Sequence, residues 1–472
     1  ATKRSLDTDP GVNMTVVAYV DDDPRKKGKA VDNVKIYHTN DLERIIELEK
    51  IDDLILSSNR LSPEKKNRIV DLCLEHDVKV LNVPPLRDWV KGSIKVNQIK
   101  NIKIEDLLER ETIVIDDLLL EEQLRGKRIL VTGAAGSIGS EIVRQVAKFN
   151  PQLIILNDIA ESALHELQLE LQDNNLSNNF IAYMGDVRNK VRMENLFQTF
   201  KPHYVYHAAA YKHVPMMENN PSEAICTNVG GTKNVADLAV KYKVTRFVMV
   251  STDKAIQSFA GALQANFAFK NGLSHLNGRE DLNTKFITTR FGNVLGSNGS
   301  VIPRFKAQIQ NGGPITVTHP DITRYFMTIP EACRLVLEAG SMGKGGEIFI
   351  FDMGQSIKIV ELAKKMIRLS GLLPNQDIKI EFTGLRPGEK LYEELLNDLE
   401  NTLPTHHEKI MIAKVVANDF ESVGTSIQQL VNLACEYEDT EVVKLMKKIV
   451  PEFKSNNSVY EELDKQNVAL TP

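Results

Sequence analysis

The stretch Lys127-Arg-Ile-Leu-Val-Thr-Gly-Ala-Ala-Gly-Ser-Ile-Gly-Ser140 decides the fold of this chain. Residues 129–131 form a short apolar run, which is typical of a buried parallel strand. Three glycines follow at the spacing G-x-x-G-x-x-G, and an amphipathic helix begins after them. A strand, a glycine turn and a helix in this order aim the N–H groups of a helix N-terminus at a phosphate. The stretch therefore predicts a turn that binds the pyrophosphate of a dinucleotide.

Each glycine has a separate role in such a turn. Gly133 permits the tight turn, Gly136 lets the backbone approach the pyrophosphate, and Gly139 lets helix and strand pack closely. Ser137 and Ile138 lie between the last two glycines and are expected to line the cofactor site. The alternative interpretation is a glycine turn that binds nothing.

A second apolar run supports the dinucleotide interpretation. Residues 153–156 form this run, and Asn157-Asp158 follows about 20 residues after the glycines, where an acidic side chain binds the ribose hydroxyls. A carboxylate at Asp158 disfavours a 2′-phosphate. The expected cofactor is therefore NAD rather than NADP.

Polar motifs follow the later strands as well. Residues 180–184 lead into Gly185-Asp186-Val187, residues 205–210 end in three alanines, and residues 247–250 lead into Ser251-Thr-Asp-Lys254. Ligands of open α/β sheets bind at the carboxyl ends of the strands. The predicted fold class is therefore α/β, with a doubly wound, mostly parallel, Rossmann-like sheet and a site along this edge.

Alternating strand and helix patterns divide the chain into four parts. Residues 1–95 lack a first strand and glycine loop, so we expect a truncated Rossmann-like domain that binds no nucleotide. Residues 96–126 are expected to be a linker with short helices. Residues 127–400 form the main domain, with a smaller substrate lobe mainly after residue 290. Residues 401–472 are a helical, charged C-terminal extension.

The composition is that of an ordinary globular protein. The 472 residues are 42% hydrophobic, and 58 basic against 63 acidic residues give a net charge of −5, which disfavours a general nucleic-acid surface. The sequence shows no metal-binding cluster and no apolar stretch long enough to span a membrane. The start at Ala1 without methionine is expected of a trimmed chain. Four cysteines without a C-x-x-C pair are expected to be buried thiols in a reducing compartment: Cys73, Cys226, Cys333 and Cys435.

Several motifs occur together and in order between residues 127 and about 400. With the glycine turn, the chain resembles the extended short-chain dehydrogenase/reductase superfamily through Gly185-Asp-Val187, His207-Ala-Ala-Ala210, Asn228 and Val250-Ser-Thr-Asp-Lys254. It is more closely similar to the nucleotide-sugar 4,6-dehydratases of bacterial polysaccharide biosynthesis through Tyr211-Lys-His-Val-Pro215, Phe291-Gly-Asn-Val-Leu-Gly-Ser297, His319-Pro-Asp-Ile-Thr-Arg-Tyr-Phe-Met327 and Arg386-Pro-Gly-Glu-Lys390.

This resemblance implies NAD as cofactor, a UDP-sugar such as UDP-GlcNAc as substrate, a homo-oligomer and no nucleic-acid partner. Residues 1–95 are similar to the second, cofactor-like domain of the long members of the family, which carry membrane helices ahead of it. The chain is therefore expected to be the soluble portion of a membrane protein, on the cytoplasmic side of the bacterial inner membrane. Its membrane segment would be absent from this chain.

The residues Thr252-Asp253-Lys254 offer the chemistry of a 4,6-dehydration. NAD⁺ takes hydride from C4 of the sugar, a base removes the C5 proton, and an acid protonates the departing C6 hydroxyl. Thr252 would bind the C4 oxygen, Asp253 would be the acid and Lys254 the base, and the resemblance implies the same roles. The alternative is that the triplet caps the next helix while Lys254 pairs with a surface carboxylate.

Further residues are expected to line the site. Asp186 and Val187 would touch the adenine ring, and Ala208, Ala209 and Ala210 would line the cofactor cleft, with ordinary strand packing as the alternative. The candidate substrate residues, for some of which surface salt bridges are the alternative, are Lys212, His213, Asn293, Ser297, Val301, Arg324, Arg386 and Glu389.

Residues 256–272 depart from the family pattern. Where the family has a Met or Tyr and then a Lys, this chain has Ala262 and Asn266, and the next lysine, Lys270, is displaced by about one helical turn. A rebuilt site, an inactive homologue and a local shift of the reading frame each explain this. Three functions stay open: a dehydratase, a catalytically impaired nucleotide-sugar-binding homologue, and a nucleotide-sugar epimerase.

Overall fold

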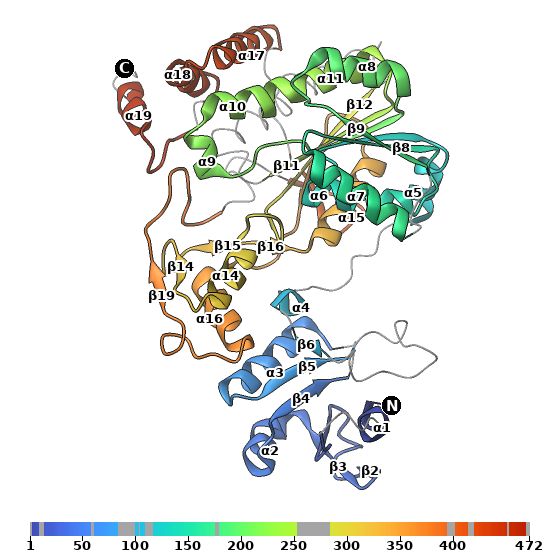
Figure 1. Ribbon diagram of the computed structural model, residues 1–472, viewed down its shortest axis with the longest axis vertical. Helices are drawn as coiled ribbons and strands as arrows, with labels where there is room; N and C mark the ends of the chain where they lie inside the picture. Colours follow the sequence, from blue (N-terminus) through green and yellow to red (C-terminus); the bar gives the residue numbers. More distant parts are fainter. Residues whose placement is uncertain are drawn as a thin grey trace. The chain divides into compact units, whose positions relative to one another are not determined.

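The computed structural model describes residues 2–8, 14–57, 61–83, 100–102, 104–108, 117–174, 179–252, 284–393, 402–413, 420–450 and 453–468. The chain forms two compact units (Figure 1). The first comprises residues 1–111, 304–316 and 360–381, and the second comprises residues 112–303, 317–359 and 382–472. Each unit therefore combines segments that are distant in the sequence.

Residues 1–111 of the first unit contain two small sheets within their described ranges. Strand β3 pairs parallel with β1 and antiparallel with β2, while β5 pairs parallel with β4 and antiparallel with β6. The antiparallel pairs differ from the parallel sheet that the alternating pattern predicts. The elements are α1 Thr2–Thr8, β1 Tyr19–Asp21, β2 Ala30–Val31, β3 Val34–His38, α2 Leu42–Glu49, β4 Asp53–Leu56, α3 Pro63–Glu75, β5 Lys79–Asn82, β6 Lys100–Asn101 and α4 Ile104–Leu108.

One nine-stranded sheet forms the centre of the second unit and confirms the predicted fold class. Seven neighbouring strands run parallel, and β21 and β20 continue the sheet antiparallel at one edge. The chain moves outward from β7 to β9 and then returns to β10 on the other side of β7. In spatial order the strands are β9 Phe180–Met184, β8 Leu153–Asp158, β7 Arg128–Thr132, β10 Tyr204–His207, β11 Arg246–Thr252, β12 Lys285–Phe291, β17 Ile348–Phe351, β21 Ile410–Ala413 and β20 Thr402–Pro404.

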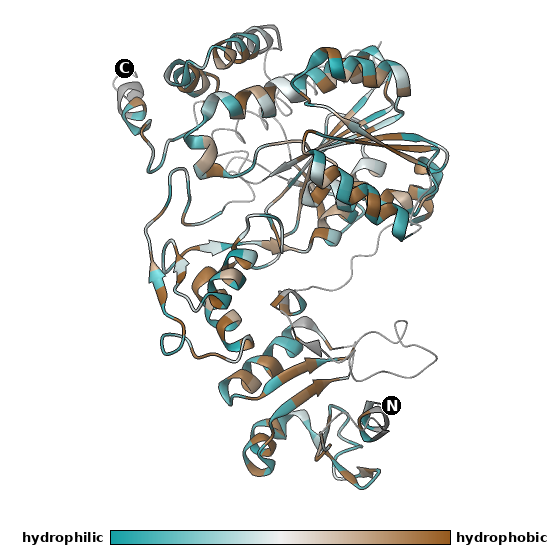
Figure 2. Cartoon of the chain, viewed as in Figure 1, coloured by the Kyte–Doolittle hydropathy of each residue, from teal (hydrophilic) through white to brown (hydrophobic). Residues whose placement is uncertain are grey.

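Helices cover both faces of this sheet (Figures 1 and 2). Ile129 and Leu130 of β7 are both fully buried, in separate apolar clusters, because alternate residues of a strand face opposite ways. One cluster includes α5, α6, α7 and α15, and the other includes α8 and α11. These helices are α5 Asp117–Leu124, α6 Ser137–Ala147, α7 Glu161–Asp173, α8 Lys190–Phe200, α11 Thr232–Lys241 and α15 Ile329–Met342.

The C-terminal helices α17 (Phe420–Cys435) and α18 (Asp439–Ile449) pack on the segment before α11. Their apolar side chains form a cluster with those of α9 (Val214–Glu218), α10 (Pro221–Ile225) and the π-helix Cys226–Gly231. Asp439 accepts a hydrogen bond from the backbone N–H of Ser222 at 3.2 Å, in the first turn of α10. The remaining elements are β13 Asn293–Val294, α14 Val301–Gln310, β14 Ile315–Val317, β15 Thr323–Arg324, β16 Phe326–Met327, β18 Ile357–Lys358, α16 Ile359–Leu369, β19 Ile380–Phe382 and α19 Glu461–Val468.

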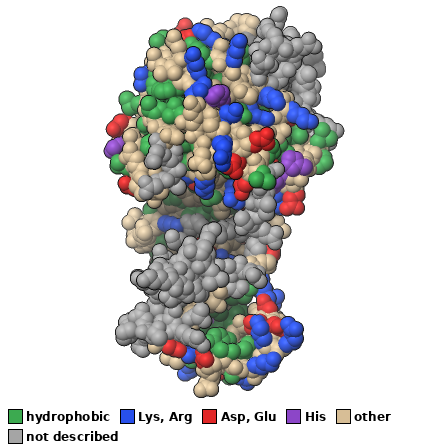
Figure 3. All heavy atoms as spheres, turned by 90° about the vertical axis from the view of Figure 1, so that its right-hand side faces the viewer, with side chains coloured by type: hydrophobic (Ala, Val, Ile, Leu, Met, Phe, Trp, Pro, Cys, Tyr) green, Lys and Arg blue, Asp and Glu red, His purple; other side chains and the backbone are tan. Residues whose placement is uncertain are grey.

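The described surface is mixed in character. On the face drawn in Figure 3, basic and acidic side chains lie among apolar ones, in keeping with the small net charge of −5. None of the described helices has the length and apolar character needed to cross a bilayer. Within the same described ranges, His, Cys, Asp and Glu side chains form no group of three that could hold a metal ion.

The expectation of four buried thiols is only half correct. Cys73 and Cys333 are buried, whereas Cys226 is half-buried and Cys435 is exposed. Cys435 is the last residue of α17, where the chain leaves the packed helix. The spacing of cysteines in the sequence carries no information about such helix ends.

Candidate functional site

The glycine turn joins β7 to α6 at the point where the strand order reverses. Gly133 has a φ of +66°, and a Cβ at this position would lie 2.7 Å from backbone atoms of Ala208 and Ala209. A Cβ at Gly139 would lie 2.0 Å from the carbonyl oxygen of Gly133. Gly136 is the N-cap of α6 and has no side chain to bind the first-turn N–H groups. The turn therefore offers backbone donors and the positive end of a helix to an anion.

A buried hydrogen-bond network joins the ends of β7 and β10. Nδ1 of His207 lies 2.7 Å from the Thr132 hydroxyl, and Nε2 lies 2.9 Å from the Thr232 hydroxyl. The Thr232 hydroxyl donates its single proton to the carbonyl oxygen of Asn228 at 2.7 Å. Nε2 of His207 must therefore carry the ring proton, and Nδ1 accepts from Thr132. Burial lowers the pKa of His207 to about 4, so the ring is neutral at neutral pH.

Asn228 fixes the segment that follows β10. Its side-chain oxygen accepts from the backbone N–H of Tyr211 at 2.8 Å, and its amide nitrogen donates to the Tyr211 carbonyl at 2.9 Å. Asn228 is 1% exposed and lies in the π-helix. The three alanines predicted to line the cofactor, residues 208–210, therefore lie between two anchored positions, His207 and Tyr211.

Asp158 lies at the end of β8, beside the glycine turn. One carboxylate oxygen accepts from the backbone N–H of Ala135 and the other from that of Ala160, both at 2.9 Å. These bonds fix the carboxylate and leave lone pairs for ribose hydroxyls. The preceding Asn157 is fully buried and donates to two carbonyl oxygens at the end of β9, those of Tyr183 within the strand and Gly185 just after it.

Asp186 and Val187 follow β9. The carboxylate of Asp186 lies 2.7 Å from Nε of Arg188, which also pairs with Glu223 at 2.8 Å. Val187 is buried, and a Cβ at Gly231 would approach its Cγ2 to 2.6 Å. Val187 therefore contributes to the core, and its contact with an adenine ring stays a prediction.

Only part of the proposed catalytic triplet lies within the described residues. Thr252 is half-buried and is the last residue of β11, two strands from β7 in the sheet. Because both strands are parallel, Thr252 lies at the same edge of the sheet as the glycine turn. Other residues of interest lie outside the described ranges: Asp253, Lys254, Ala262, Asn266 and Lys270.

A loop after β13 contacts the start of α6. The backbone N–H of Asn298 donates to the Ser137 hydroxyl at 3.3 Å, and a Cβ at Gly299 would lie 2.7 Å from the ring of His213. The predicted substrate residue Ser297 is buried in this loop, and its hydroxyl donates to the carbonyl oxygen of Val294, the last residue of β13. The other predicted substrate residues here are Lys212, which is exposed, and Val301, which begins α14.

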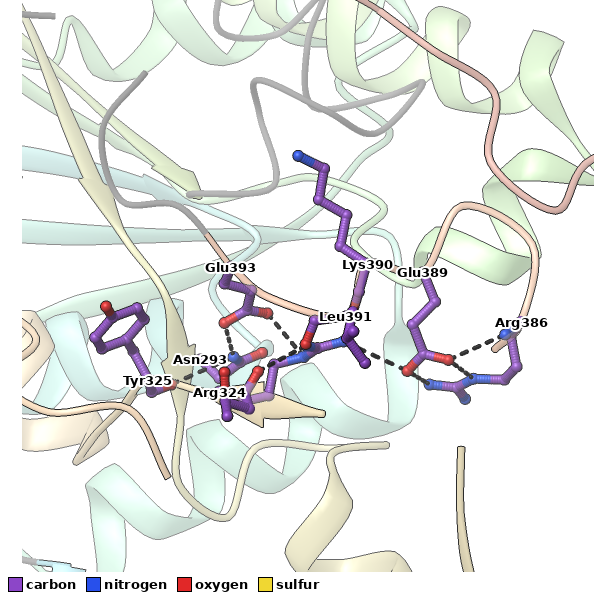
Figure 4. Close-up of polar contacts among 9 residues, drawn as sticks. Asn293, Arg324, Tyr325, Arg386, Glu389, Lys390, Leu391 and Glu393 are labelled. Carbon is purple, nitrogen blue, oxygen red and sulfur yellow. Dashed lines mark hydrogen bonds and ion pairs between the residues drawn. The ribbon is translucent and has the colours of Figure 1, made fainter. Parts of the chain in front are cut away.

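Arg324 holds a separate segment of the second unit in place (Figure 4). Its side chain is 12% exposed, and Nε lies 3.1 Å from the carboxylate of Glu393. A guanidinium has five N–H groups, and most of those of Arg324 already face protein acceptors. This geometry favours a positioning role, and contact with a pyrophosphate stays a prediction. The other acceptors are the carbonyl oxygens of Thr323, Lys390 and Leu391.

Arg386 and Glu389 form the more open end of this network. Their side chains lie 3.1 Å apart, and Glu389 also lies 3.5 Å from Arg324. Burial opposes ionisation of Glu389, but hydrogen bonds from Arg386 and the charges of both arginines hold its pKa below the usual range. Asn293 joins the network by donating to Glu393 at 2.7 Å. Arg386 is 49% exposed, so it can reach an anionic ligand in solution.

Four polar residues of the site were not among those predicted. They share a position inside an apolar run or a packed helix, where an unsatisfied polar group is costly. A polar residue at such a position in the sequence could have indicated a buried hydrogen-bond network, because a buried polar side chain needs hydrogen-bond partners. These residues are Thr132, Asn157, His207 and Thr232.

Sequence comparisons identify related proteins. A sequence model of a family described as "Polysaccharide biosynthesis protein" matches residues 129–415. The chain is 45% identical over 426 residues to the capsular polysaccharide biosynthesis protein CapD of Staphylococcus aureus, covering 89% of this chain and 70% of that protein. It is 36% identical to a UDP-glucose 4-epimerase of Rickettsia rickettsii, covering 58% of this chain and 79% of the epimerase.

Solved structures resemble this chain in fold. The X-ray structure of Pen from Bacillus thuringiensis has a TM-score of 0.57 and 33% identity, covering 65% of this chain and 98% of Pen. DesIV, a dTDP-glucose 4,6-dehydratase from Streptomyces venezuelae solved with NAD bound, has a TM-score of 0.50 and 20% identity, covering 64% of this chain and 96% of DesIV. At the lower identity the likeness is one of fold.

Proposed function

We propose that this chain, which belongs to the polysaccharide biosynthesis protein family, binds NAD and dehydrates a UDP-N-acetylhexosamine, UDP-GlcNAc, to its 4-keto-6-deoxy sugar. One observation carries the NAD-binding part of this proposal. Gly133 and Gly139 sit where any Cβ would meet backbone atoms at 2.0 to 2.7 Å, so the turn is packed closely around donors that fit a pyrophosphate. Asp158 lies beside this turn through its bond from Ala135.

Each residue of the site has a separate task in this reaction. Bound NAD⁺ supplies a hydride acceptor that later returns the hydride. The glycine turn would hold the pyrophosphate, and Asp158 would orient the adenosine ribose. Thr252 would hydrogen-bond the C4 oxygen of the sugar, while Lys254 takes the C5 proton and Asp253 donates a proton to the departing C6 hydroxyl.

A nucleotide-sugar 4-epimerase is the second candidate. The identity of 36% to the Rickettsia UDP-glucose 4-epimerase favours it. A simple 4-epimerase needs no base at C5 and no acid at C6, so the triplet Thr252-Asp253-Lys254 favours dehydration. The departure at Ala262 and Asn266 is the feature that favours a binding homologue without activity.

One incubation separates these functions. Purified protein is incubated with UDP-GlcNAc and NAD⁺, and the nucleotide sugars are analysed by liquid chromatography and mass spectrometry. A dehydratase gives a product lighter by one water, and an epimerase gives a new peak of unchanged mass. Calorimetric binding of both ligands without a new product would leave only the binding homologue.

We also propose that the parent protein works as a homo-oligomer at the cytoplasmic face of the inner membrane, as the sequence resemblance implies. Membrane fractionation of cells that express the full-length gene, with detergent release, tests the attachment. Recovery of the full-length protein in the soluble fraction would contradict it.

A further inference from the structure

Two cysteines that are 209 positions apart in the sequence face each other in the second unit. Sγ of Cys226 and Sγ of Cys435 lie 3.8 Å apart. Cys226 opens the π-helix, and Cys435 closes α17. We propose that Cys226 and Cys435 form a redox-modification site, in which a hydroperoxide such as hydrogen peroxide oxidises the two thiols to a disulfide. The bond would tie the C-terminal extension covalently to the helix that carries Asn228.

The surroundings of the two sulfurs assign their roles. Cys435 is exposed, so its thiol meets solvent and a small oxidant first. Burial, together with the neighbouring Cys435, raises the pKa of Cys226 to about 12, which keeps that thiol protonated at neutral pH. Cys435 is therefore the attacking sulfur and Cys226 the resolving one.

The reaction balances in two steps. The Cys435 thiolate attacks one oxygen of hydrogen peroxide, the O–O bond breaks, and a sulfenic acid and hydroxide form. The hydroxide takes up the proton released when Cys435 ionised and becomes water. The sulfur of Cys226 then attacks the sulfenic sulfur, and its own proton leaves with the hydroxyl group as a second water. The two sulfurs lose two electrons in total, which the peroxide oxygens gain.

The two remaining cysteines provide matched controls. Cys73 and Cys333 are both fully buried, and burial raises the pKa of each thiol. Peroxide at one equivalent should therefore leave both unmodified in the folded chain. A Cys73→Ser variant keeps the proposed pair intact and controls for the loss of one thiol.

The whole chain is tested after reduction and removal of the reductant. One equivalent of hydrogen peroxide should lower the titratable thiols of the denatured protein from four to two, since the sequence has four cysteines. A tryptic digest should contain a linked Cys226–Cys435 peptide, lighter by two hydrogens than its two parts and split by reductant. Cys73→Ser should keep this peptide, and Cys435→Ser should lose it.

A second readout is the melting temperature. A disulfide that closes a loop of this length restricts the unfolded chain, so oxidation should raise the melting temperature by several degrees in the wild type and not in Cys435→Ser. Any of three results would overturn the proposal. These are a disulfide through Cys73 or Cys333, a disulfide between two chains, and conversion of Cys435 to a sulfinic acid without a linked peptide.

Discussion

Replacing Gly139 by alanine tests how the glycine turn works. The new Cβ would lie 2.0 Å from the carbonyl oxygen of Gly133, 2.7 Å from its carbonyl carbon and 2.9 Å from the Cα of Ala134. All three atoms belong to backbone, so no side chain can rotate away. Helix α6 and the end of β7 must therefore separate by about 1 Å before the variant folds without overlap.

The magnitude follows from two opposing effects. Overpacking of a well-packed site costs about 1–3 kcal/mol, and this contact, made entirely with backbone, places Gly139→Ala at the upper end. Alanine in a helix gains about 1 kcal/mol over glycine, which offsets part of the loss. We therefore expect the free energy of unfolding to fall by about 1–2 kcal/mol. The displaced N–H groups should also weaken NAD binding by about tenfold or more.

A matched variant isolates the effect of the close contact. Gly230 is also helical, but a Cβ there would lie 3.4 Å from the Val431 side chain and 3.8 Å from the carbonyl oxygen of Ile225, which are ordinary contacts. Gly230→Ala should be neutral or slightly stabilising and should leave NAD binding unchanged. Urea unfolding and calorimetric titration with NAD⁺ measure both quantities. A Gly139→Ala protein that is as stable as wild type and binds NAD⁺ equally well would refute the reasoning.

Three other perturbations test the remaining parts of the site. Burial lowers the pKa of His207 from 6.5 to about 4, so the unfolded chain binds more protons than the folded chain between these pH values. The neutral ring therefore makes its full contribution to the free energy of unfolding above pH 6.5. This free energy should fall by about 3 kcal/mol as the pH decreases towards 4. Urea unfolding against pH should show a shallower slope for His207→Asn, and equal slopes would contradict the buried neutral ring. Arg324→Met should lower the free energy of unfolding by about 3 kcal/mol, because it leaves the nearly buried Glu393 without its cation. Arg386→Met should lower it by less than about 1 kcal/mol, because Arg386 is half-exposed. Similar losses for the two variants in urea titrations would contradict this difference. Lys254→Met should slow dehydration about 10²–10⁴-fold while UDP-sugar binding survives, and full activity by mass spectrometry would move the base to Lys212 or Lys270.

The sequence predicts the parts of the site whose partners are close along the chain. The strand predicted around residues 129–131, the glycine turn and the helix after it are confirmed as β7, the connection and α6. Local patterns suffice here, because the apolar run predicts a strand, the three glycines predict a tight turn and the amphipathic pattern predicts a helix. The position of Asp158 follows for the same reason, since it ends the next strand.

Pairings across long stretches of sequence are not visible in such patterns. His207 forms hydrogen bonds with Thr132, which lies 75 positions earlier, and with Thr232, which lies 25 positions later. No local sequence pattern indicates either partner. The antiparallel strands β20 and β21 and the meeting of Cys226 with Cys435 depend on tertiary packing in the same way. Asn40 shows the limit within a local pattern. Asparagine is a preferred N-cap residue, so the sequence alone predicts that Asn40 caps the helix after it. In the structure Asn40 lies in a 3₁₀ turn, and Asp41 takes the cap position.

The bond between Ser222 and Asp439 has a consequence for synthesis of the chain. The two residues are 217 positions apart, so at 5–20 residues per second the ribosome delivers Asp439 roughly 10–40 s after Ser222. During this interval the apolar side chains of Ala224, Ile225 and Val229 lack their partners on α17 and α18. The nascent chain therefore carries an uncovered apolar surface beside Asn228 until its last helices emerge, and chaperones that bind such surfaces would find it there.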